Sequence, residues 1–147
     1  MRNRSFATLG VLALLAAASA FGQSNVRYDI PFEFHFKDTV MPAGQYDVNA
    51  ATNNQRNLLS LEGDGGRPHG YIVTHGIGGG TDVPAEGRLV FNKYGDTYYL
   101  AEVWTPGDPQ GAALAKSKTE RESARTTPDV ARVTLPVRKS HVAIARR

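Results

Sequence analysis

The sequence contains no cysteine, and this absence restricts both its chemistry and its means of attachment. Without a thiol the chain forms no disulfide, carries no acylated cysteine anchor and offers no cysteine nucleophile. Other catalytic signatures are missing too: there is no Gly-x-Ser-x-Gly elbow, His-Glu-x-x-His zinc helix, EF-hand loop or Gly-Lys-Ser/Thr phosphate loop. We therefore expect no cofactor, and the sequence favours a protein that is not an enzyme.

Net charge is also small once the N-terminus is set apart. The full chain has 17 Lys+Arg and 14 Asp+Glu, but the first 22 residues hold two of the basic residues and none of the acidic ones, which leaves a formal charge of about +1. Nucleic-acid binding depends on a concentrated positive field. Nucleic acid is therefore not an expected partner.

The first residues have the order of a secretory signal peptide. Arg2 and Arg4 precede the apolar stretch 9–18, which leads into the small residues Ala18-Ser19-Ala20. The apolar run is interrupted and shorter than the roughly 20 residues that span a bilayer. We predict a signal over residues 1–22, cleaved after Ala20 or Gly22. The general secretory route would then deliver the chain to the periplasm or the medium, with no transmembrane segment after processing.

Residues 23–147 have the length and composition of a single β-rich domain. From Val26 to Phe36 every even position is apolar, which predicts one strand with a buried face, and Pro31 marks it as an edge strand or one with a bulge. Turn residues then separate three further predicted strands, at 45–50, 58–62 and 69–75. The glycine-rich stretch 76–81 is expected to be a flexible loop.

A hairpin is predicted over Arg88–Trp104, with its two-residue turn at Gly95-Asp96. Pairing outward from this turn sets Leu89 opposite Glu102. Glu102 and Trp104 then share the apolar face of the hairpin with Leu89.

The C-terminal third is predicted to hold one helix and one strand. Residues 112–124 are good helix formers without Gly or Pro, so we expect a short, mostly solvated helix. Residues 130–137 alternate as a last strand, and 138–147 form a basic tail. About seven strands without βαβ alternation predict an all-β, mainly antiparallel fold, either a small sandwich or a partly open barrel, with one short helix near the C-terminus.

Four short motifs resemble those of an uncharacterised family of small exported bacterial proteins. The resemblance covers most of the chain after the signal and implies a similar β fold, but no activity, cofactor or catalytic residue. The motifs are Ile30-Pro31-Phe32-Glu33-Phe34, Met41-Pro42-Ala43-Gly44-Gln45-Tyr46, Val103-Trp104, and Ser117-Lys118 followed by Glu120-Arg121.

The candidate ligand-binding residues are Tyr46, Glu102 and Trp104. Aromatic rings such as Tyr46 and Trp104 fill small β cores, and the alternative is that they stack on a ligand. Glu102, if buried among apolar side chains, would have a raised pKa and could act as a general acid. The other interpretation is a rim glutamate paired with Arg88, Lys118 or Arg121.

Two histidines are the only candidates for a metal site. His69 and His75 share a face of one predicted strand, but they are roughly 20 Å apart if that strand is extended. A bent strand that recruits Asp82 or Glu86 could bring them together, whereas exposed histidines are the ordinary interpretation.

These observations lead to three hypotheses. The first is an exported, non-catalytic β-domain that binds envelope components or self-associates, with the proline-marked edge strand at 26–36 accepting another strand. The second is a small β-barrel that carries an apolar or glycan ligand. The third is a hydrolase that uses Glu102 or the two histidines.

Overall fold

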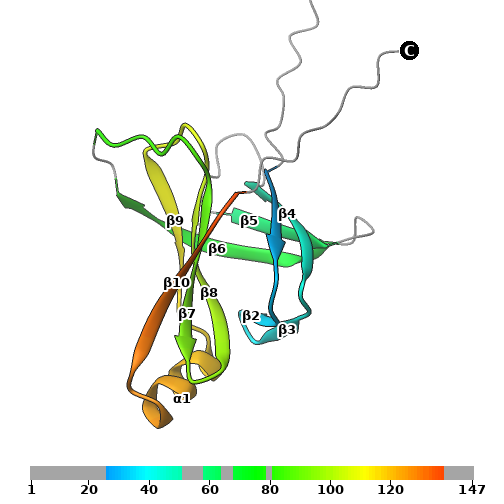
Figure 1. The fold of residues 1–147 in the computed structure, drawn as a ribbon, viewed down its shortest axis with the longest axis vertical. Coiled ribbons are helices and arrows are strands. Elements are labelled where there is room, and N and C mark those ends of the chain that lie inside the picture. The colour runs from blue at the N-terminus through cyan, green and yellow to red at the C-terminus, as the bar shows by residue number, and fades with distance from the viewer. Residues whose placement is uncertain (1–25, 51–57, 64–67, 79–80, 138–147) are drawn as a thin grey trace, which may run out of the picture.

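The computed structural model describes residues 26–50, 58–63, 68–78 and 81–137. The predicted signal peptide and the basic tail lie outside these residues. The all-β prediction is confirmed, because the chain forms an open, mainly antiparallel sheet with one short helix near the C-terminus (Figure 1). None of the helices in the described part of the chain is long and apolar enough to cross a membrane.

The described residues form ten strands rather than about seven. In chain order the elements are β1 (Val26–Ile30), β2 (Phe34–Phe36), β3 (Thr39–Met41), β4 (Gly44–Ala50), β5 (Leu58–Gly63), β6 (Pro68–Gly78), β7 (Arg88–Tyr94), β8 (Thr97–Trp104), β9 (Gln110–Leu114), α1 (Lys118–Thr126) and β10 (Val130–Pro136).

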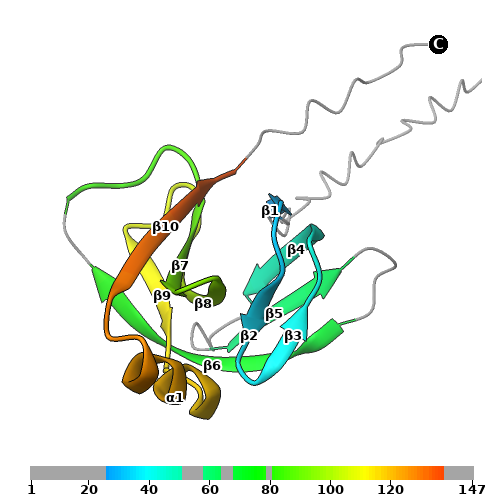
Figure 2. The same cartoon turned by 60° about the horizontal axis from the view of Figure 1, so that its bottom comes forward.

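The long strand β6 joins two halves of the sheet. Its first part pairs with β5, which continues to β4 and β1, and its second part pairs with β9, which continues to β8, β7 and β10. Figure 2 shows the two halves facing each other, with β6 running along both. The short hairpin β2–β3 attaches to β8 by a parallel bridge between His35 and Tyr99.

The core lies between the two halves and is rich in aromatic rings. The buried Phe34 ring packs edge-to-face on Tyr46 and on Phe91, with centroids 5.3 Å and 5.5 Å away. Tyr28 crosses the same core, and its hydroxyl donates to the carbonyl oxygen of Trp104 at 3.2 Å. Burial raises the pKa of Tyr28 to about 12. The core therefore binds strands of both halves together.

The predicted strand from Val26 to Phe36 is two strands. β1 ends at Ile30 and β2 begins at Phe34, because Pro31 has no N–H to continue a ladder. Within the described residues β1 pairs with β4 alone, so the prediction of an edge strand is confirmed. The expected alternation survives the break, since both Ile30 and Phe34 are fully buried.

The glycine-rich stretch was wrongly predicted to be a loop at its start. Gly76, Ile77 and Gly78 continue β6 and pair with β9. A Cβ atom on Gly78 would come within 3.1 Å of the Trp104 ring, and one on Gly111 within 2.7 Å. Glycine is needed at these two strand positions because the tryptophan ring lies against the backbone.

The helix begins later than predicted. Ala112 to Leu114 belong to β9, which is held between β6 and β8, and α1 starts at Lys118. Ser117 is the N-cap, and its hydroxyl accepts a hydrogen bond from the backbone N–H of Glu120. Tertiary pairing on both sides outweighs the helix propensity of the alanines.

The hairpin register is right near the turn and wrong beyond it. Phe91 faces Leu100, but a bulge shifts the ladder by one residue, so that Leu89 faces Val103 and Val90 faces Glu102. The bulge turns Val103 into the core and sends Glu102 to the outer face of the sheet.

Candidate functional site

Trp104 lies on the outer face of β8, in contact with glycine backbone and an arginine. Gly111 on β9 and Gly78 on β6 provide the flat surface against which the ring packs. The guanidinium carbon of Arg88 lies over the ring, 4.5 Å from its centroid. Both contacts use the ring surface that a stacked ligand would need.

Glu102 is held by two donors on that same face. One carboxylate oxygen accepts from the Trp104 Nε1–H at 2.9 Å, and the other is paired with Arg132 of β10. Partial burial by itself raises the pKa of Glu102, but the two hydrogen bonds and the charges of Arg132 and Arg88 outweigh it and lower the pKa. The condition for a general acid, a raised pKa, is therefore not met.

Tyr46 is buried and closes the turn that precedes it. Its hydroxyl donates to the carbonyl oxygen of Pro42 at 2.6 Å, and its ring packs on Phe34. The Pro-Ala-Gly-x-Tyr motif is thus a self-closing unit in which the ring anchors the turn to the core.

The two candidate metal ligands both lie on β6. The His75 side chain is exposed, while the side chain of His69 lies outside the described part of the structure. Among the described residues, no group of three or more His, Asp or Glu side chains is arranged to hold a metal ion.

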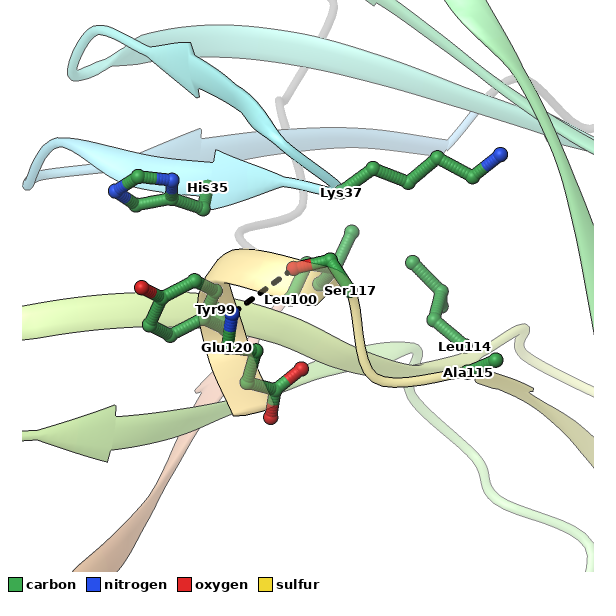
Figure 3. A pocket seen from close by; sticks show the side chains of 8 residues that line it. All are labelled: His35, Lys37, Tyr99, Leu100, Leu114, Ala115, Ser117 and Glu120. Atoms are coloured by element: carbon green, nitrogen blue, oxygen red, sulfur yellow. Dashed lines mark hydrogen bonds between the residues drawn. The ribbon is translucent and has the colours of Figure 1, made fainter. Parts of the chain in front are cut away.

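A small pocket lies where β8 changes neighbours, from β9 at Glu102 to β2 at Tyr99 (Figure 3). The lining residues are His35, Lys37, Tyr99, Leu100, Leu114, Ala115, Ser117 and Glu120. The cavity volume is about 10 Å³, which is about what one water molecule needs. The pocket is thus suited to a single water and too small for an organic ligand.

His35 is a pocket residue whose setting the sequence did not reveal. Its odd position in the predicted strand 26–36 lies opposite the expected buried face, but its ring stacks on Tyr99 with centroids 4.6 Å apart. Its Nδ1 atom is buried and has no hydrogen-bond partner among the described residues. A water in the pocket is a suitable partner for this nitrogen.

Helix α1 packs on the sheet through polar side chains. Glu120 is only 4% exposed, and its carboxylate accepts from Asn92 Nδ2 at 2.9 Å and from the Tyr94 hydroxyl at 3.2 Å. One turn later, the hydroxyls of Ser123 and Tyr99 are 2.8 Å apart. The helix is mostly exposed, as predicted, but its one buried side chain is the Glu120 carboxylate, whose contacts are with the strands of the sheet.

The outer edge of β10 is the largest unpaired strand edge in the described part of the chain. β10 has seven residues and pairs with β7 alone, whereas the edge strand β3 has three. Most of its side chains are exposed, and the inward-facing Val133 and Leu135 are only partly buried against the core. An edge with unpaired backbone groups and half-covered apolar side chains is a template for another strand.

No protein-family model, curated protein or solved structure matches this chain.

Proposed function

We propose that the protein is an exported, non-catalytic β-domain that binds or assembles in the cell envelope by accepting a strand at the outer edge of β10. The observation that carries this proposal is the edge itself: seven residues long, exposed, and paired on one side only within the described residues. Strand addition draws affinity from main-chain hydrogen bonds and specificity from alternate side chains.

The inner side chains of β10 support this use of the edge. Val133 faces Phe91 and Leu135 faces Leu89 across the ladder, yet both remain partly exposed while their partners are fully buried. An added strand with apolar residues at alternate positions would cover them and extend the core by one strand.

The contacts of Glu102 support a non-catalytic role. Glu102 is held between Trp104 and Arg132 with a lowered pKa, so it stays ionised and is a poor proton donor near neutral pH. Its contacts join β8 to β10 across β7, which is a structural function.

The proposal that the protein is exported rests on its N-terminal sequence. The basic start, apolar stretch and Ala18-Ser19-Ala20 site lead to a processed chain that begins after Ala20 or Gly22. Because the general secretory route carries unfolded chains, the sheet and its open edge would form outside the cytoplasm.

The test is native mass spectrometry of the protein purified from the envelope and medium fractions of its host. We expect a processed chain that carries a protein partner or forms a defined oligomer. Thr134→Pro removes one backbone N–H of β10 and should weaken the complex by about tenfold or more, whereas Thr134→Val keeps the N–H and should retain the complex. An unprocessed chain in the cytoplasm, or a bound small molecule that Thr134→Pro leaves in place, would overturn the proposal.

A further inference from the structure

We infer that the strand received by β10 is β10 of a second copy, in an antiparallel pair centred on Val133. This inference rests on the proposed function only in using the same edge as the binding surface. It specifies the partner, the register and the residues that face each other, none of which follows from an open edge alone.

The ladder between β7 and β10 determines which backbone groups point outward. The N–H of Val137 donates to the carbonyl oxygen of Gly87 at 2.8 Å, and the register from there to Val130 has no shift. In an antiparallel ladder, residues that exchange hydrogen bonds alternate with residues that do not. The backbone groups directed away from β7 are therefore those of Val130, Arg132, Thr134 and Pro136.

The position of proline agrees with this assignment. Pro136 is one of the outward residues, where its missing N–H removes nothing from the ladder with β7. The outward edge thus presents donors at Val130, Arg132 and Thr134, and carbonyl oxygens at these positions and at Pro136.

One register of two β10 strands uses all of these donors without a charge conflict. With Val133 opposite its counterpart, Arg132 faces Thr134 of the second copy and Val130 faces Pro136 of the second copy. Each outward N–H then meets a carbonyl oxygen. A shift that sets Arg132 opposite Arg132 places like charges together, and a shift that sets Thr134 opposite Thr134 leaves Val130 beyond the end of the partner strand.

The side chains fit the same register. On the inner face Val133 meets its counterpart and Leu135 meets Ala131, which covers the two apolar side chains that one copy leaves partly exposed. On the outer face Val130, 49% exposed, meets Pro136.

The other long edge is less suited to the same role. Tyr28 and Ile30 of β1 are already buried, at 1% and 0% exposed, so an added strand would cover little apolar surface there. Pro31 follows directly and ends the strand. On the inner face of β1 only Val26 is partly buried, whereas β10 has two such side chains, Val133 and Leu135.

Cysteine cross-linking tests the register directly, since the natural chain has no cysteine. In a non-hydrogen-bonded antiparallel pair the Cα atoms are about 4.5 Å apart, within the range of roughly 4.4–6.8 Å that a disulfide spans. The variant Val133→Cys should therefore form a covalent dimer under mild oxidation. In the matched variant Thr134→Cys the two thiols are offset by two residues, roughly 8–9 Å between Cα atoms, and should not cross-link.

Sedimentation of the mature wild-type protein should show a monomer–dimer equilibrium. Thr134→Pro removes one donor from each copy and should weaken the dimer by about tenfold or more. Thermal unfolding of each variant under reducing conditions checks that the monomer still folds. A wild-type protein that stays monomeric, with Val133→Cys cross-linking no faster than Thr134→Cys, would overturn the inference, and so would faster cross-linking of Thr134→Cys.

The two proposals fail in different ways. If an envelope protein is captured in a β10-dependent complex while the wild-type protein alone stays monomeric, the second copy is the wrong partner and the proposed function stands. If the dimer forms as described but the chain is neither processed nor found outside the cytoplasm, the dimer stands and the proposed function is wrong.

Discussion

At the scale of single residues, the partners of Glu102 matter more than its burial. Its carboxylate is partly withdrawn from water, which favours the neutral acid, but an indole N–H and a guanidinium favour the anion and prevail. The result is a pKa below the ordinary value of 4.5. A folded-state pKa below the unfolded one means that ionised Glu102 stabilises the fold above about pH 4.5, and that this contribution is lost as pH falls through the lowered pKa.

The variant Glu102→Gln should therefore be less stable than wild type at pH 7 but not at low pH. We expect a loss of about 0.5–1 kcal/mol in the free energy of unfolding at pH 7, a modest value because Arg132 is largely exposed. Near pH 2 the difference should vanish. Urea unfolding at the two pH values measures it, with Glu33→Gln at an exposed position as the control. An equal loss at both pH values would show that the charge of Glu102 has no part in it.

At the scale of elements, α1 depends on hydrogen bonds rather than on an apolar face. Glu120→Ala would leave the Asn92 amide and the Tyr94 hydroxyl without their acceptor. We expect a loss of about 2–3 kcal/mol in the free energy of unfolding, because buried donors without acceptors retain their desolvation cost.

The matched control for Glu120→Ala lies on the same helix. Glu122 is exposed, so Glu122→Ala should change stability by less than about 0.5 kcal/mol. Chemical denaturation measures both variants, and amide hydrogen exchange should show faster exchange across α1 in Glu120→Ala only. Equal effects of the two substitutions would mean that the buried contacts do not hold the helix.

Strands with one apolar face could be predicted from the sequence, because the alternation of apolar and polar residues shows directly which side chains face the core. This holds for Tyr28 and Ile30 in β1, and for Tyr46 and Val48 in β4, all buried as their positions indicated. The break after Ile30 was marked by a proline, whose effect on a ladder is local.

Elements that depend on distant partners could not be predicted in this way. Ala112 to Leu114 favour a helix in isolation, and only pairing with β6 and β8 makes them a strand. No residue type in the sequence indicates the bulge between Leu100 and Glu102. The side of the sheet on which Glu102 lies could therefore not be predicted. Its partner Arg132 is 30 residues away and belongs to another strand.

At the scale of the whole molecule, the two halves of the sheet share one core. The Phe34 ring touches Tyr46 of one half and Phe91 of the other, so neither half buries its apolar face alone. The strand β6 also runs through both halves, which leaves no natural boundary between them. A molecule built in this way should unfold in one cooperative transition.

The variant Phe34→Leu tests whether the two halves of the sheet unfold together. It should lower the free energy of unfolding by about 1–2 kcal/mol through lost ring contacts and incomplete filling of the core. Trp104, the only tryptophan in the chain, reports on one half by fluorescence, and far-ultraviolet circular dichroism reports on the sheet as a whole. Both signals should shift to the same new midpoint, while Val40→Ala, at a 51% exposed position, should leave them in place. If Phe34→Leu moves the circular dichroism transition and leaves that of Trp104 unchanged, the two halves unfold separately and the shared core does not couple them.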